Sequence, residues 1–401
     1  MTRVQWVLSR LSRRTTSGQF IPEIDGLRFV SIAAVMLFHL CGYTVVKSKA
    51  VHFDSAAANF VALLGSTGHY GVQLFFIISG FVLALPFARY RLLGGPRPRL
   101  GAYYLRRLTR LEPPYIIAMA GVFAIGTLYY GVSARALAPH LVASLAYIHN
   151  LVYGVGSTMN IVAWSLEVEV QFYLLAPLLA MLFVIPGRIA RRLAIVASIA
   201  AIVVIQLLWP TDSGRLALSL PHYLQFFLLG FLIADLYLVS WRTPSQHARL
   251  WDLIGIMAWV ALIALWMLVA RPNAMFLALA FLIFCATFRG RVIRTVFCNV
   301  WITTIGGMCY SIYLLHYPLI SSVGRHTAPI AGHHGFILHL LVQVVLMVPV
   351  VLIASTIFFV LIERPCMRKD WPQRLVAWFR TDWPAVRRDL IPQRVRSIWG
   401  A

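Results

Sequence analysis

Ten apolar stretches, each about 20 residues long, restrict the fold of this chain more than any other feature. A helix needs about 20 apolar residues to cross the hydrocarbon layer of a bilayer. Inside lipid, only helices and closed barrels satisfy their own backbone hydrogen bonds, so stretches of this length predict an all-α bundle. We expect spans at about 27–46, 70–88, 114–131, 163–185, 190–209, 220–240, 252–270, 273–288, 301–322 and 335–362.

The composition agrees with a polytopic membrane protein. Hydrophobic residues make up 60% of the chain and charged residues 12%, whereas soluble domains have about 45–50% and 25%. The formal net charge of +22 could suggest a nucleic-acid partner, but we recognise no nucleic-acid-binding module and expect no such partner. The basic residues instead concentrate on alternate loops, which predicts that both termini are cytoplasmic and the number of spans even.

We expect one membrane domain, residues 25–365, between a basic N-terminal segment, 1–24, and a basic, tryptophan-rich tail, 366–401. Both flanking segments are predicted to be cytoplasmic, and the tail suits the surface of an anionic leaflet. The first apolar stretch is too long for a signal-peptide core, so we expect it to remain in the mature protein. Because no loop is long enough for a soluble core, any chemistry should occur in the bundle or at its surfaces.

Arg28 and His39 lie eleven residues apart in the first apolar stretch. Eleven helical steps of about 100° place both side chains on one face, about 16 Å apart along the axis. This spacing puts Arg28 at one membrane surface and His39 near the middle. An ionisable side chain at that depth is a candidate functional residue, with a hydrogen bond to a neighbouring helix as the structural alternative.

Two carboxylates occur at the start of the fourth predicted span, within Trp164-Ser-Leu-Glu-Val-Glu-Val-Gln-Phe-Tyr173. Helical geometry places Ser165, Glu169 and Tyr173 on one face and Glu167 on another. One carboxylate could complement a buried cation while the other lies near the external interface, or one could be a solvated helix end. Ser165 and Tyr173 are candidates for supporting a substrate beside Glu169.

An arginine patch, defined here as Arg106, Arg107 and Arg110, precedes the third span. Spacings of three and four place these side chains together on a short helix, where guanidinium groups could bind the phosphates of a polyanionic ligand. Cytoplasmic arginines also act simply as topology signals. Pro113 and Pro114 predict that the loop gives way to the membrane helix there.

Tyr313 and His316 lie three residues apart in the ninth predicted span and should share one side of a helix. They could donate hydrogen bonds to a substrate. The alternative is an aromatic belt beside a helix that ends at Pro318. The five cysteines show no CxxC spacing, so we predict no disulfide framework, no metal site and no permanently bound cofactor.

Six short motifs, in order along the chain, together resemble one family. The sequence is similar to integral membrane acyltransferases of the acyltransferase-3 family, which includes bacterial O-acetyltransferases that modify carbohydrates. The resemblance rests on Asp25-Gly-Leu-Arg28 with His39, Gly71-Val-Gln-Leu-Phe-Phe-Ile-Ile-Ser-Gly80, Arg106-Arg-Leu-Thr-Arg110, Trp164 to Tyr173, Tyr310-Ser-Ile-Tyr-Leu-Leu-His316 and Glu363-Arg-Pro365.

The resemblance implies roles for particular residues. The family's essential arginine and histidine fall on Arg28 and His39, its RxxR element on Arg107 and Arg110, and its serine-leucine-x-x-glutamate element selects Glu169. Many members carry aspartate where this chain has Gln73, which argues against an obligatory charge there. We expect no SGNH-type hydrolase-like domain in this chain, so any partner activity would come from a separate protein or not be needed.

The implied reaction is transfer of an acyl group, most often acetyl, from cytoplasmic acyl-CoA to a carbohydrate hydroxyl. We expect the arginine patch, and also Arg28, to hold the donor phosphates, and His39 to act as general base. A covalent acyl-histidine is the other route. Glu169 could orient His39, and Tyr313 or His316 could bind the acceptor or the thioester carbonyl.

These features predict a multi-pass enzyme of the bacterial cytoplasmic (inner) membrane that functions in polysaccharide biosynthesis. The acceptor could be an O-antigen, an exopolysaccharide or another cell-surface glycan. A bundle with buried His, Glu and Arg could also be a secondary transporter or a lipid-linked sugar flippase. The chain shows no evident internal repeat, which argues against a transporter.

Overall fold

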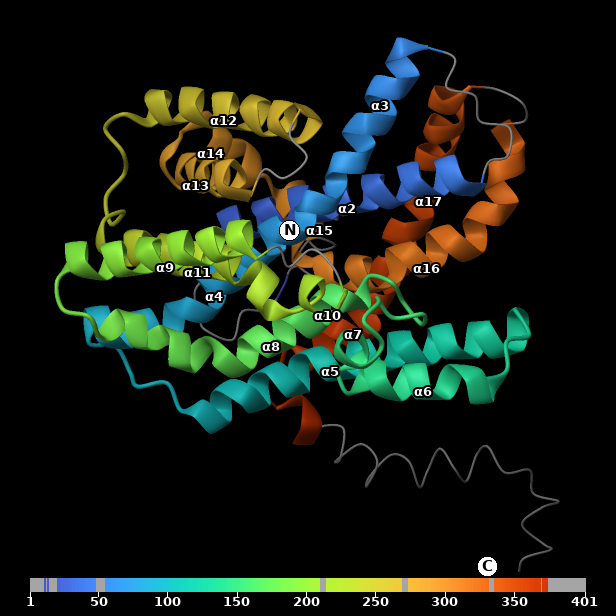
Figure 1. The fold of residues 1–401 in the computed structure, drawn as a ribbon, viewed down its shortest axis with the longest axis horizontal. Helices are drawn as coiled ribbons and strands as arrows, with labels where there is room; N and C mark the ends of the chain where they lie inside the picture. The colour runs from blue at the N-terminus through green and yellow to red at the C-terminus, as the bar shows by residue number, and fades with distance from the viewer. Residues whose placement is uncertain are drawn as a thin grey trace, which may run out of the picture.

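In the computed structural model, the chain forms a bundle of helices (Figure 1). The structure describes residues 11, 13, 20–47, 55–209, 214–268, 273–331, 335–368 and 370–373. Regular secondary structure in these ranges is entirely helical, which confirms the predicted all-α fold. Most of the predicted flanking segments, 1–24 and 366–401, lies outside the described residues.

The helices are named here in chain order. The first half contains α2 (Pro22–Lys47), α3 (Ala56–Ser66), η1 (Thr67–Tyr70), α4 (Gly71–Leu93), α5 (Leu100–Ala124), η2 (Ile125–Tyr129), α6 (Ala134–Leu145), α7 (His149–Tyr153), α8 (Ala163–Leu179), η3 (Ala180–Val184) and α9 (Arg188–Leu208). The second half contains α10 (Gly214–Ala217), α11 (Leu220–Val239), α12 (Ala248–Leu268), α13 (Asn273–Arg289), α14 (Val292–Phe297), α15 (Val300–Gly307), α16 (Cys309–Thr327), η4 (Ala328–Ala331), α17 (Phe336–Phe358), η5 (Phe359–Glu363) and α18 (Arg364–Cys366).

Eight helical segments in the described ranges are long and apolar enough to cross a membrane, so the chain is a multi-pass membrane protein. These segments correspond to α2, α3 with α4, α5 with η2, α8 with η3, α9, α10 with α11, α12, and α17 with α18. α13 is apolar but shorter. The total number of ten spans and the cytoplasmic location of both termini remain predictions.

The predicted boundary at Pro113 and Pro114 is wrong, and the alternative in which a helix ends at Pro318 does not hold, because both helices continue through these prolines. α5 starts at Leu100 and passes through Pro113 and Pro114, so the arginine patch lies on the membrane helix itself. α16 likewise continues past Pro318 to Thr327, and a break at Met308 separates it from α15. A proline removes one helical hydrogen bond, but neighbouring helices in a membrane bundle compensate.

α2 lies in the middle of the bundle in Figure 1, with α12, α13 and α14 on one side of it and α5 and α6 on the other. It packs against α4, α15, α16 and α17. This position surrounds Arg28 and His39 of α2 with other helices. A second close pairing, between α4 and α11, forms the core beside it.

Two glycines allow α4 and α11 to touch. A Cβ atom added at Gly80 would overlap the carbonyl oxygen of Phe227, and one added at Gly230 would overlap the carbonyl oxygen of Ile77. Membrane helices commonly pack closely at such small residues. The hydrophobic effect contributes little to association between helices inside lipid, so close van der Waals packing must stabilise the contact.

Replacing Gly80 by alanine is expected to separate these helices and destabilise the protein by about 1–3 kcal/mol or more, the usual cost of overpacking. Thermal unfolding of the detergent-purified protein would measure the loss. Gly121→Ala is the matched control, since a Cβ at this position in α5 meets no atom within 4 Å. Equal stability of the two variants would contradict the packing that we describe.

Candidate active site

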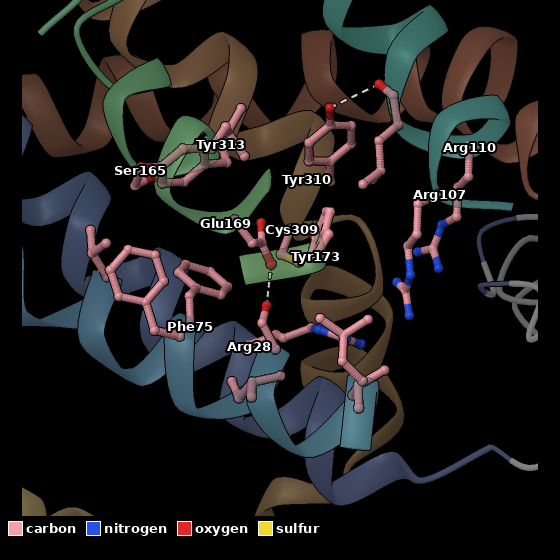
Figure 2. Close-up of a pocket in the computed structure, with 18 of the residues that line it drawn as sticks. Arg28, Phe75, Arg107, Arg110, Ser165, Glu169, Tyr173, Cys309, Tyr310 and Tyr313 are labelled. Atoms are coloured by element: carbon pink, nitrogen blue, oxygen red, sulfur yellow. Dashed lines mark hydrogen bonds between the residues drawn. The ribbon is translucent and has the colours of Figure 1, made fainter. Parts of the chain in front are cut away.

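An inner cavity of about 110 Å³ lies among α4, α5, α8 and α16. Figure 2 shows that its two ends differ in chemistry: Arg107 and Arg110 lie at one end, and Phe75 and Tyr313 at the other, with Glu169 between them. The cavity therefore runs from a cationic mouth to an aromatic end.

A larger outer pocket, of about 1500 Å³, shares part of its lining with this cavity. Its wall carries a single carboxylate, Asp25, among the described residues. Its arginines are Arg13, Arg28, Arg89, Arg97, Arg99, Arg106, Arg107, Arg110 and Arg368. Four of these, Arg13, Arg28, Arg107 and Arg110, also line the inner cavity. Such a concentration of guanidinium groups would attract a polyanion and align it with the mouth of the cavity.

Arg28 is fixed at this mouth by Asp25, one turn before it on α2. The Arg28 guanidinium donates to Asp25 over 2.5 Å, and Arg13 donates to the same carboxylate oxygen over 3.1 Å. Asp25 is only 2% exposed. The carboxylate therefore holds two cations in place and offsets part of the charge repulsion between them.

Glu169 lies inside the cavity with the neighbours that helical spacing predicts. Ser165 and Tyr173 line the same cavity, which confirms that the three side chains share one face of α8. Ser79 of α4 donates a hydrogen bond to Glu169, and Tyr173 also bonds it. The Arg107 guanidinium lies 5.5 Å from the centre of the Tyr173 ring, so α5 and α8 supply the charged middle of the cavity.

Glu167 has a different, structural role. Its carboxylate is fully buried and accepts a hydrogen bond of 2.8 Å from the backbone N–H of Asn150, at the start of α7. Neither glutamate is a solvated helix end, because Glu169 is largely enclosed and Glu167 completely so. Glu169 thus lines the cavity, whereas Glu167 supports the neighbouring helix α7.

The aromatic end is closed by hydrogen-bonded and stacked side chains. The Tyr313 hydroxyl donates to the Val162 carbonyl over 3.0 Å and lies 2.6 Å from the Ser165 hydroxyl. The rings of Phe75 and Tyr313 meet edge to face, with centroids 6.0 Å apart. These contacts hold Tyr313 in one orientation between the cavity and His316, whose ring centroid lies 5.7 Å away.

His39 and His316 form a pair just beyond this end and do not themselves line the inner cavity. Nδ1 of His39 lies 3.1 Å from Nε2 of His316 and 3.0 Å from the Val35 carbonyl oxygen. Nδ1 of His316 lies 3.0 Å from the carbonyl oxygen of Ile312, and therefore carries its proton. His39 must then donate from Nδ1, which leaves the lone pair on its Nε2.

The structure therefore pairs His39 with His316 rather than with Glu169, the partner proposed from sequence. His316 is fully buried; it accepts a hydrogen bond from His39, bonds its own helix and lies beside the Tyr313 ring. The ring of Tyr317 also packs against His39, with centroids 5.0 Å apart. His39 is thus held in one tautomer and one orientation.

The three members of the arginine patch are not equivalent. Arg107 and Arg110 enter the inner cavity, whereas Arg106 lines the outer pocket alone. The Arg106 side chain is exposed and donates to the Ala102 carbonyl over 2.9 Å. The predicted patch therefore divides into two inner residues and one outer residue.

Sequence reasoning assigned no role to three residues that complete the site. Arg13 lies in the basic N-terminal segment and Ser79 in the Gly71–Gly80 motif, and the sequence pattern singles out neither. Glu363 formed part of a motif without a role; it is buried in the cavity wall and accepts hydrogen bonds from the Ser311 hydroxyl over 2.5 Å and the Ser311 N–H over 3.1 Å. A carboxylate near the end of an apolar stretch was the available signal, because such a group needs a buried partner.

This chain is similar to known proteins over most of its length. Residues 21–364 match the acyltransferase-3 family model, an acyltransferase domain. The peptidoglycan O-acetyltransferase OatA of Listeria monocytogenes is 24% identical over 343 residues, which cover 77% of this chain and 51% of that protein. The O-acetyltransferase OatA of Staphylococcus aureus is 24% identical over 337 residues, covering 77% and 52%.

The chain thus spans about half the length of these relatives. No solved structure matches it. The family match extends from the end of the N-terminal segment to Arg364, so it includes every helix that lines the inner cavity. The chain therefore belongs to the acyltransferase-3 family, and it does so as a multi-pass membrane protein.

Proposed function

We propose that this protein is an O-acyltransferase of the bacterial inner membrane that moves an acetyl group from cytoplasmic acetyl-CoA to a hydroxyl of a cell-surface carbohydrate. The observation that carries the proposal is the arrangement of the site: the arginine-lined outer pocket shares four arginines with the inner cavity, and the histidine pair lies just beyond the aromatic end of that cavity, next to Tyr313. The name of the Listeria relative makes peptidoglycan one candidate acceptor.

The donor would enter from the arginine side. Its phosphates suit the outer pocket, because guanidinium groups bind phosphate oxygens with charge-assisted hydrogen bonds. Arg107 and Arg110 line both the outer pocket and the inner cavity. The thin pantetheine arm would pass between them and place the thioester near Glu169 and Tyr313, while the nucleotide stays outside.

The histidine pair would supply the proton chemistry. Nε2 of His39 takes the proton of the acceptor hydroxyl as the hydroxyl oxygen attacks the thioester carbonyl carbon. A C–O bond forms, the C–S bond breaks, and the departing CoA thiolate receives the proton from the imidazolium. His316 accepts a hydrogen bond from Nδ1 of His39 and keeps the reactive nitrogen free. We propose that Tyr313, between the cavity and the pair, binds the acceptor or the thioester carbonyl.

A covalent route would use the same nitrogen. In that route Nε2 of His39 attacks the thioester, CoA leaves, and the hydroxyl then displaces the imidazole from the acetyl group. Incubation of the purified protein with radiolabelled acetyl-CoA, without acceptor, followed by rapid denaturation would separate the routes. Label retained on wild-type protein but not on His39→Ala would support the acyl-histidine.

The proposed activity is testable in inverted membrane vesicles, whose cytoplasmic face is outward. Vesicles that contain the protein should transfer radiolabelled acetyl groups from added acetyl-CoA to a base-labile ester on carbohydrate. Vesicles from a strain lacking the gene are the control for background, and right-side-out vesicles are the control for donor side. A transporter or flippase would form no ester in any preparation, and that outcome would contradict the proposal.

A further inference from the structure

We infer that Phe75 sets the upper limit on the length of the acyl group that this site accepts, and that the site is restricted to short acyl donors. The inference rests on the proposed function, since it concerns the acyl group of the donor. It depends on three features of the aromatic end: its position, its size and its rigidity.

Phe75 lies at the end of the cavity where an acyl chain would arrive. A donor anchored by Arg107 and Arg110 must extend its thioester away from them, toward the end that Phe75 and Tyr313 close (Figure 2). The carbon chain beyond the carbonyl is the foremost part of the donor. It would therefore meet the aromatic wall first.

The cavity is small. Its volume is about 110 Å³, whereas an apolar cavity of about 150 Å³ in another protein holds one benzene molecule. The sulfur, carbonyl and methyl of an acetyl thioester are fewer atoms than benzene contains. An octanoyl group extends several methylenes further and exceeds the space available without movement of the wall.

The wall has little freedom to move. Next to Phe75, the buried ring of Phe76 stacks on Phe227 with centroids 4.8 Å apart and contacts Tyr223 at 5.1 Å. Tyr313 is held by its hydrogen bonds to Ser165 and to the Val162 carbonyl. Phe75 itself is half-buried: it packs against the edge of the hydrophobic core and meets the Tyr313 ring edge to face. Among these rings, Phe75 can be shortened with the least loss of packing.

The test compares acetyl-, butyryl-, hexanoyl- and octanoyl-CoA as donors in inverted vesicles, with release of CoA thiol as the measurement. One methylene in a tight pocket changes kcat/KM by about 10–200-fold, so wild-type kcat/KM should fall at least tenfold from acetyl to butyryl. Phe75→Ala should raise kcat/KM for butyryl or hexanoyl-CoA at least tenfold. Phe75→Trp should lower kcat/KM for butyryl- and hexanoyl-CoA below the wild-type value. Phe75→Leu replaces Phe75→Ala if the alanine variant does not accumulate.

Phe231→Ala is the matched control, because it removes the same atoms from a fully buried ring that lines neither cavity. It should leave the ranking of donors unchanged. Equal use of all four donors by the wild type, or an unchanged ranking in Phe75→Ala, would overturn the inference while the acyltransferase activity stands. Failure of the wild type to use any of the donors would contradict the proposed function itself.

Discussion

His39→Ala should lower acyl transfer by about 10²–10⁴-fold, the usual contribution of a general base. The variant keeps the donor pocket intact, because His39 lines neither cavity. The KM for acetyl-CoA should therefore change little while kcat falls. Ester-linked acyl groups on the host's surface carbohydrate, measured in a strain without paralogues, would report the loss in cells.

His140→Ala is the control for removal of a partly buried histidine. His140 lies on α6, where it contacts His149 at 2.9 Å, and it lines neither cavity. This variant should retain wild-type transfer. Both proteins must reach the membrane in equal amounts for the comparison to hold. Normal acylation by correctly inserted His39→Ala would exclude His39 as the base.

The same measurement separates the base from the residue that positions it. His316 lines neither cavity and bonds Nδ1 of His39, so we expect it to act on the reaction by positioning His39. His316→Ala should therefore lower kcat less than His39→Ala does. His316→Gln, whose amide oxygen can accept the same hydrogen bond, should recover part of the activity, whereas His39→Gln should recover none.

Hydropathy and helical period predict much of this fold because each membrane helix satisfies its own backbone. They place a helix at each apolar stretch, and they assign Ser165, Glu169 and Tyr173 to one face of α8. These are local properties of a single helix. Prolines mislead the same reasoning, as at Pro113 and Pro114, because a membrane helix can continue through a proline when the surrounding bundle compensates for the lost hydrogen bond.

Contacts between distant helices could not be predicted in this way. His39 and His316 are 277 residues apart in the sequence, and Ser79 and Glu169 are 90 apart. A pattern shows which face of a helix is polar but not which helix covers that face. The sequence therefore offered Glu169 as the partner of His39, although α16 supplies a histidine closer to it.

The double variant Arg107→Ala with Arg110→Ala should raise the KM for acetyl-CoA by about 10²–10⁴-fold. Each charge-assisted hydrogen bond contributes about 1.5–3 kcal/mol, and every 1.4 kcal/mol corresponds to about tenfold in affinity. Initial rates of CoA release in inverted vesicles would measure the effect. Arg106→Ala is the control: its side chain is exposed, bonds the Ala102 carbonyl and stays outside the inner cavity, so KM should change less than tenfold.

A shorter donor shows whether these arginines bind phosphates or only support the cavity. S-acetylpantetheine carries the thioester arm without the nucleotide and its phosphates. If Arg107 and Arg110 bind phosphates, the wild type should use S-acetylpantetheine at least as poorly as the double variant uses acetyl-CoA, and the double variant should use S-acetylpantetheine as well as the wild type does. If Arg107 instead acts by its contact with Tyr173 beside Glu169, the double variant should be impaired with both donors. That second result would mean that Arg107 and Arg110 do not bind the donor phosphates.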